Sequence, residues 1–265
     1  MNLRFLAAEL GDDQPFYGLQ HRGVDGRLKP HQSVEAMARE YLEHIRQFSP
    51  KGPYFVGGFS SGGVAAYELA QQLLRLGEEV AVVVFFDTIN PLGCDHSIWD
   101  RLLRHYSGAR KAGARYVMSR LKKRFQRDIG LARLHAKAQL SHFRAFDYRH
   151  EAVSAAWTSA ERRYRPDQYP GHVALFKARE QGPDFDGIHT TDASNGWQPF
   201  VSGRLEVVDI DSDHVNLVHE RHAKTTAIEL RRVLLEARER AERSASPRTR
   251  IGIESPVASA APSND

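Results

Sequence analysis

The residues best suited to chemistry lie in a short glycine-rich stretch, residues 57–63. Within it, Gly58, Ser60 and Gly62 form the pattern G-x-S-x-G, which is typical of a serine nucleophile on a sharp turn between a strand and a helix. Such a turn demands a strained backbone at the serine and small residues on either side, where strand and helix approach closely. Because the pattern arises by chance in about one chain in ten of this length, the surrounding sequence must support it.

A serine hydroxyl becomes a strong nucleophile only when a base takes its proton, and two further residues fit this need. Asp87 and His214 each follow an apolar run that predicts a strand. Carboxyl ends of parallel strands meet at one edge of a sheet, where a carboxylate could orient the imidazole and stabilise its protonated form. Asp211 and Asp213 are rival acids, although their closeness to His214 in sequence favours loop or capping roles.

The elements around these residues predict an α/β fold. The continuous apolar run of residues 80–86 is typical of a strand buried on both faces of a parallel sheet. Helical periodicity with capping signals alternates with such runs. The expected strands are residues 16–19, 54–56, 80–86, 173–176 and 205–210; the expected helices are residues 3–10, 34–49, 64–76 and 222–243. We therefore expect an α/β-hydrolase-like, mostly parallel sheet with helices on both faces.

Two stretches differ in character from this alternation. Between about residues 97 and 163 strand signals vanish and basic residues crowd a helical pattern, which indicates a helical insertion. It is either a lid over the site or a plain packing element, and its charges fit either an acidic partner or a solvated face. The folded domain should span residues 1–243, and the Ser-, Pro- and Ala-rich residues 244–265 are typical of a disordered tail.

Composition narrows the class of protein. The chain has 265 residues, 41% of them hydrophobic, a net charge of +4 and a single cysteine, Cys94. One cysteine permits no internal disulfide, and without a signal peptide or a bilayer-length apolar run we expect a cytoplasmic protein with no membrane partner. Sparse aromatic residues among the basic ones argue against nucleic acid. His214, His219 and His222 lack accompanying cysteine or acidic ligands, so no metal site is expected.

Several motifs together resemble one family, the thioesterase domains of nonribosomal peptide synthetases and polyketide synthases, within the α/β-hydrolase superfamily. The resemblance covers about residues 3 to 240. The motifs that carry it are residues 13–20, Gly52-Pro53-Tyr54, Gly62-Gly63, Ala66-Tyr67-Glu68-Leu69-Ala70, Phe86-Asp87-Thr88, residues 169–176 and Asp213-His214.

This resemblance implies a catalytic triad of Ser60, Asp87 and His214, with the backbone N–H of Ser61 as one donor of the oxyanion hole. The implied substrate is an acyl or peptidyl chain held as a thioester on the phosphopantetheine arm of a carrier protein. No cofactor of the enzyme's own is implied. Release would pass through an acyl-Ser60 intermediate that water or an internal nucleophile resolves.

The chain departs from the family pattern at its start. Family members begin with a strand and a loop of His, Pro and Gly residues that donates the second oxyanion N–H, whereas this sequence opens at the following helix. We expect that strand and loop to be encoded upstream of Met1. Two alternatives stay open: a general carboxylesterase, and a catalytically impaired remnant that at most binds carrier protein.

Overall fold

The fold is built on one parallel sheet. The computed structural model describes residues 3–25, 27–92, 146–180 and 192–245. Four strands pair in parallel in the order β1-β2-β3-β4. Their bounds are β1 Tyr54–Phe59, β2 Val80–Phe86, β3 His172–Glu180 and β4 Arg204–Asp213. Because all four run the same way, their carboxyl ends lie at one edge of the sheet, as the sequence predicts.

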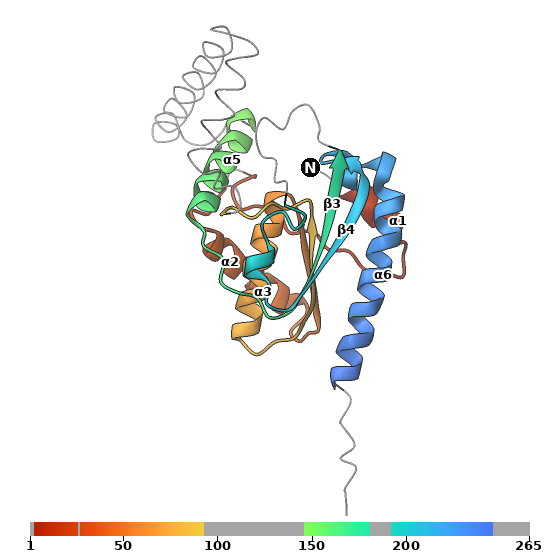
Figure 1. The fold of residues 1–265 in the computed structure, drawn as a ribbon. Helices are drawn as coiled ribbons and strands as arrows, with labels where there is room; N and C mark the ends of the chain where they lie inside the picture. Colours follow the sequence, from red (N-terminus) through yellow and green to blue (C-terminus); the bar gives the residue numbers. More distant parts are fainter. Residues whose placement is uncertain (1–2, 26, 93–145, 181–191, 246–265) are drawn as a thin grey trace, which may run out of the picture.

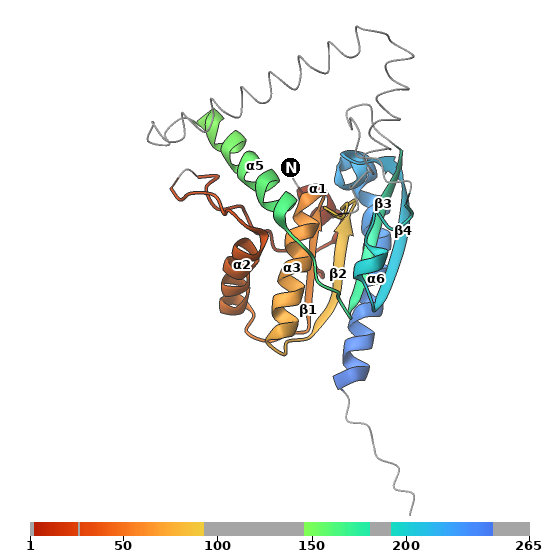
Figure 2. The same ribbon diagram turned by 60° about the vertical axis from the view of Figure 1, so that its left-hand side comes forward.

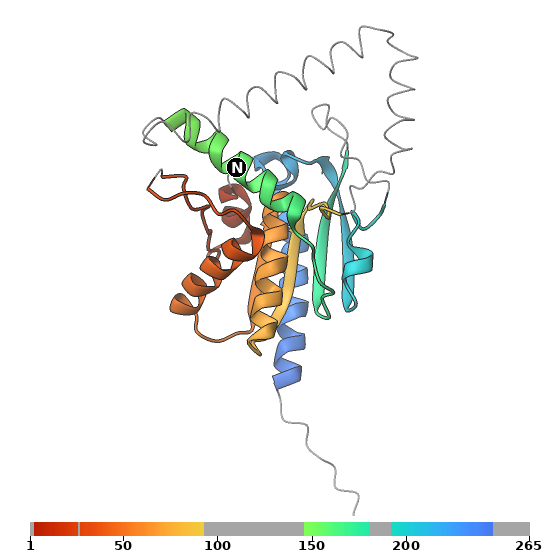
Figure 3. The ribbon, with the colours of Figure 1, turned by 90° about the vertical axis from the view of Figure 1, so that its left-hand side faces the viewer.

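Helices cover both faces of this sheet, so the molecule has three layers. They are α1 Arg4–Leu10, α2 Val34–Phe48, α3 Ser61–Arg75, α5 Phe146–Arg163 and α6 Glu220–Ala245, with short 3₁₀ helices at Gln198–Phe200 and Asn216–Val218. Figures 1 and 2 show α2, α3 and α5 on one side of the sheet and α1 with α6 on the other. Figure 3 shows α3 in front of the strands and α6 behind them.

Strand β2 is apolar throughout because both of its faces are buried. Val83 and Phe85 pack in the cluster on the α3 side, and Val82, Val84 and Phe86 pack in the cluster on the α6 side. This confirms the prediction for residues 80–86. Burying one such side chain contributes about 1.5–3 kcal/mol.

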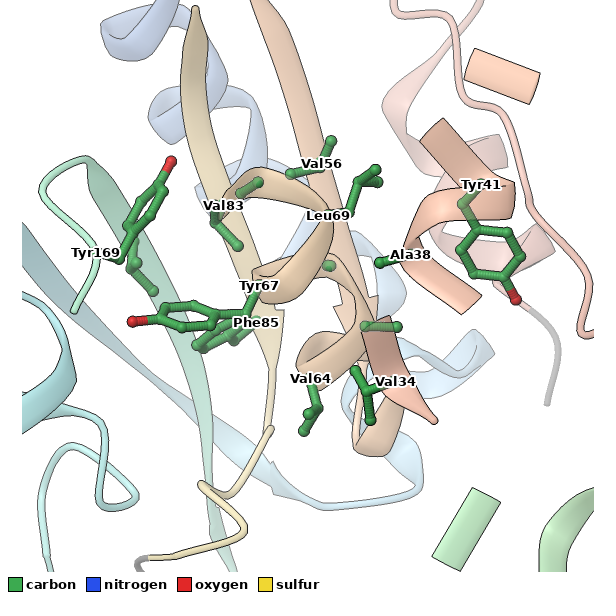
Figure 4. Packing of buried hydrophobic residues seen from close by; sticks show 14 of the residues in the cluster. Val34, Ala38, Tyr41, Val56, Val64, Tyr67, Leu69, Val83, Phe85 and Tyr169 are labelled. Atoms are coloured by element: carbon green, nitrogen blue, oxygen red, sulfur yellow. The ribbon is translucent and has the colours of Figure 1, made fainter. Parts of the chain in front are cut away.

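The core on the α3 side joins three elements. Figure 4 shows Val83 and Phe85 of β2 beside Tyr67 of α3, with Ala38 of α2 to the right of that helix. The rings of Tyr67, Phe85 and Trp197 pack against one another, with centroids 4.6 to 6.1 Å apart. This packing fixes α3, and with it the turn that precedes α3, against the sheet.

Local signals start and end the helices where the sequence predicts them. The hydroxyl of Ser33 accepts a hydrogen bond from the N–H of Ala36 at 3.1 Å, which caps α2. Gly11 ends α1 with a φ of 80°, a conformation that favours glycine. The observed bounds confirm the four predicted helices and four of the five predicted strands, with ends that differ by a few residues.

The fifth strand prediction, residues 16–19, is wrong. This segment pairs with no strand among the residues that the structure describes, and Tyr17 lies 69% exposed with its ring against Phe48 at the end of α2, centroids 4.6 Å apart. A strand forms only where a neighbouring strand satisfies its backbone groups, and this segment runs beside a helix instead.

Other expectations fall partly outside the described residues. Of the predicted insertion, residues 97–145 lie outside them and α5 forms the remainder. Of the predicted tail, Ser244 and Ala245 end α6 and residues 246–265 lie outside. None of the helices in the described ranges is long and apolar enough to cross a membrane.

Candidate active site

Ser60 occupies the turn between β1 and α3, and its backbone is strained as the motif predicts. Its φ is 52° and its ψ is −127°, a region that side chains other than glycine rarely adopt. The N–H of Ser60 still pairs with β2, donating to the carbonyl of Phe86 at 2.8 Å, while α3 begins at the next residue. The serine is therefore held on a sharp turn at the carboxyl edge of the sheet.

Two glycines permit this turn, and they are not the pair that the motif predicts. A Cβ at Gly58 would overlap backbone atoms of Gly62 and Gly63, so the close approach expected there is found. A Cβ at Gly62 would meet no atom within 4 Å among the described residues. At Gly63, by contrast, a Cβ would overlap Thr88 Oγ1 and lie 2.8 Å from its Cβ and Cγ2. The close contacts are therefore at Gly58 and Gly63. On the helix side this is one position later than Gly62, which the motif predicts.

Asp87 and His214 meet at this edge, although 127 positions separate them in the sequence. His214 Nδ1 lies 2.7 Å from Asp87 Oδ2, and both side chains are largely shielded, 12% and 14% exposed. Because an ionised carboxylate only accepts hydrogen bonds, Nδ1 is the nitrogen that donates in this contact, and Nε2 is the nitrogen that the predicted base would use. The two residues predicted as base and orienting acid thus have the geometry that those roles require.

The imidazole of His214 also lies beside the serine turn. Phe59, the residue before Ser60, packs on the His214 ring with centroids 4.7 Å apart. The serine turn, His214 and Asp87 therefore gather at one edge of the sheet, as their places at strand ends predict. The catalytic role of Ser60 stays a prediction.

Asp211 and Asp213, the alternatives to Asp87 as the orienting acid, have other surroundings. Asp213 accepts hydrogen bonds from the N–H groups of Val215 and Asn216, at 3.0 and 2.9 Å, and so caps the turn after β4. The bond from the Asn216 N–H is the main reason that the pKa of Asp213 lies below its usual value. Asp211 is exposed on β4. Capping is thus the role of Asp213, as its sequence position favours.

Thr88 connects the acid loop to the serine turn, and sequence reasoning did not single it out. Its buried hydroxyl donates to the carbonyl of Ser60 at 2.8 Å. Its own carbonyl accepts from Trp197 Nε1 at 3.0 Å and lies 3.5 Å from Asn195 Nδ2. The only local signal for this brace is that Thr88 follows Asp87; its partners come from 28 and 109 positions away.

The start of α3 supplies backbone N–H groups next to the serine. The first N–H groups of a helix have no carbonyl partner four residues earlier, and the helix dipole favours negative charge there. The Ser61 N–H, at the first helical position, stays the predicted oxyanion donor. Over the part of the chain that the structure describes, no group of three or more His, Cys, Asp or Glu side chains could hold a metal ion.

Comparison with known proteins identifies the family. The model of the thioesterase domain family matches residues 4–232. The chain belongs to this family. As a thioesterase domain it is similar to a dimodular nonribosomal peptide synthase of Bacillus subtilis, 29% identical over 80% of this chain and 9% of that protein. It is also similar to malpibaldin synthetase of Mortierella alpina, 27% identical over 80% of this chain and 3% of that protein.

These relatives are far longer than this chain, which spans under a tenth of either. Solved structures agree on the fold. The RedJ thioesterase from the prodiginine pathway of Streptomyces coelicolor superposes with a TM-score of 0.55 at 21% identity, over 86% of this chain and 80% of that one. The predicted fold class, an α/β-hydrolase-like sheet covered on both faces, and the resemblance to these thioesterase domains are confirmed.

Proposed function

We propose that this thioesterase domain releases acyl or peptidyl chains from the phosphopantetheine thioester of a carrier protein in nonribosomal peptide or polyketide synthesis. The observation that carries the proposal is the 2.7 Å contact of His214 with Asp87 beside a strained serine turn, in a chain of this family. The similarity to two peptide synthetases supports the class of substrate.

The first half-reaction transfers the chain to the enzyme. Ser60 Oγ attacks the thioester carbonyl while His214 Nε2 takes its proton, and Asp87 stabilises the resulting imidazolium. The carbonyl oxygen becomes negatively charged next to the Ser61 N–H and the positive end of α3. When the intermediate collapses, the carbon–sulfur bond breaks and the pantetheine sulfur receives the proton from His214. The chain is then an ester of Ser60.

The second half-reaction frees the chain. Neutral His214 takes a proton from water, or from a hydroxyl or amine of the chain itself, which then attacks the ester carbonyl. Collapse breaks the bond to Ser60, and His214 returns a proton to Ser60 Oγ. The same three side chains thus serve hydrolysis and ring closure.

The matched pair of an acyl-pantetheine thioester and its oxygen ester tests this proposal. We expect faster turnover of the thioester, and loss of turnover of both substrates in Ser60→Ala. Preference for the oxygen ester would instead support a general carboxylesterase. Thioester turnover that persists in Ser60→Ala would overturn the proposed nucleophile. Binding of a carrier protein without any turnover would support a role restricted to binding.

A further inference from the structure

The carboxylate of Asp87 is held on both of its oxygens, and one of the groups that holds it has no part in the triad. Oδ2 accepts from His214 Nδ1 at 2.7 Å. Oδ1 lies 3.3 Å from two donors, the N–H of Ala178 on β3 and Nδ2 of Asn195. Asn195 is only 3% exposed. A buried amide thus faces the oxygen that His214 does not use.

Asn195 is itself fixed by the loop that carries it. Its carbonyl accepts from the N–H of Asn90 at 3.0 Å, which joins this loop to the one that begins at Asp87. The Asp192 carboxylate accepts from the N–H groups of Ser194 and Gly196, at 2.9 and 2.8 Å, and so closes the turn from within. The bond from the Ser194 N–H is the main reason that the pKa of Asp192 lies below its usual value.

Position 195 requires two properties of asparagine, its tolerance of a positive φ and its side-chain amide donor. The φ of Asn195 is 51°, a conformation that asparagine tolerates better than most side chains do. The amide nitrogen must face Asp87, because the amide oxygen would repel a carboxylate that only accepts hydrogen bonds. Aspartate would fit the backbone but would place a second negative charge against Asp87.

We propose that Asn195 is a positioning residue, which fixes the Asp87 carboxylate so that Oδ2 stays aimed at His214 Nδ1. This inference rests on the proposed function. Without the amide, the Ala178 N–H remains as a donor to Oδ1, and the carboxylate gains freedom to rotate away from the imidazole. The loss should fall on the chemical step, because the amide contact is with the carboxylate that orients His214.

The variant Asn195→Gly removes the amide and keeps a residue at ease with this φ. A hydrogen bond to a charged group has a strength that corresponds to about ten- to a hundredfold in rate. We expect kcat for the pantetheine thioester to fall about tenfold or more with KM within about twofold of the wild type. Asn195→Asp should lower kcat further than Asn195→Gly does. The control is Gln71→Ala, which removes another buried amide, one that donates from α3 to the Asp167 carbonyl, and it should keep kcat within about twofold.

A double-mutant comparison separates positioning from general damage. The rate of fluorophosphonate labelling at Ser60 is measured in the wild type, Asn195→Gly, Asp87→Ala and the double variant. If Asn195 acts through Asp87, the substitution of Asn195 slows labelling in the wild type and changes nothing once Asp87 is absent. Equal slowing in both backgrounds, or equal loss of kcat in Gln71→Ala, would overturn the proposal.

The same measurements keep this proposal separate from the proposed function. Wild-type turnover that disappears in Ser60→Ala supports the thioesterase mechanism whatever Asn195 does. If that result holds while Asn195→Gly keeps the wild-type kcat, only the role of Asn195 is wrong. If the wild type shows no turnover that depends on Ser60, both proposals are wrong.

Discussion

Substitution of the two neighbouring glycines at the start of α3 should change stability in opposite directions. In Gly63→Ala, the new methyl group would overlap Thr88 Oγ1 and lie 2.8 Å from Thr88 Cβ and Cγ2. Thr88 is fully buried, so the threonine can yield only by displacing its neighbours or by giving up its bond to the Ser60 carbonyl. In Gly62→Ala, the new methyl meets no described atom within 4 Å.

The magnitudes follow from three effects. Overpacking a core typically destabilises by about 1–3 kcal/mol, and losing one hydrogen bond adds about 0.5–1.5 kcal/mol. Replacing glycine by alanine in a helix returns about 1 kcal/mol. Gly63→Ala should therefore lower the unfolding free energy by about 1–3 kcal/mol, whereas Gly62→Ala should raise it by up to about 1 kcal/mol.

Denaturant unfolding of the wild type and both variants, followed by circular dichroism, measures these differences. Thr88→Ala in the Gly63→Ala background removes Oγ1 and Cγ2 and should recover part of the loss. Equal stability of Gly63→Ala and the wild type would refute the steric argument, and so would equal destabilisation by the two glycine substitutions.

Three further predictions concern other parts of the fold. Burial, with Arg240 nearby, lowers the pKa of His172 to about 4. The unfolded chain, with a histidine pKa of about 6.5, therefore takes up the proton first as pH falls, and this histidine should lower the unfolding free energy by about 2 kcal/mol between pH 7.5 and 5. Urea titrations of His172→Gln should lack this part of the drop. An unchanged pH dependence in the variant would contradict the reasoning. The Tyr164 hydroxyl donates to the buried Glu68 carboxylate at 2.9 Å, so Tyr164→Phe should lower the unfolding free energy by about 2 kcal/mol; no loss in denaturant unfolding would count against this bond. Ser33→Ala, which removes the cap of α2, should lower the unfolding free energy by about 1 kcal/mol, whereas Ser33→Gly should lower it by only a few tenths of that; equal effects would argue against the cap.

The sequence predicts the elements and the ends of the strands well, because their signals are local. The run of residues 80–86 is apolar at every position, and a strand buried on both faces requires that. The closeness of Asp87 and His214 could be predicted in the same way, since both follow strands and the carboxyl ends of parallel strands share an edge. Their contact, His214 Nδ1 to Asp87 Oδ2, is the first consequence of the topology.

The residues that hold Asp87 and the Ser60 turn in place could not be predicted in the same way. Asn195 lies 108 positions from Asp87, and Thr88 reaches back 28 positions to Ser60. Hydrogen bonds of this kind depend on the register of loops, which carry no periodic pattern. The motif also misplaced one close approach, because the sequence cannot tell which residue in the first turn of α3 faces Thr88. The segment of residues 16–19 has the composition of a strand, but composition supplies no partner strand.

The most direct test of the central claim is the reaction of the protein with a fluorophosphonate, followed by peptide mapping. This reagent modifies a serine only when a base activates its hydroxyl. We predict a single adduct on Ser60 in the wild type, formed at least a hundredfold more slowly in His214→Ala, since a triad acts as a unit. An adduct on another residue, or labelling of Ser60 at the wild-type rate in His214→Ala, would contradict the account.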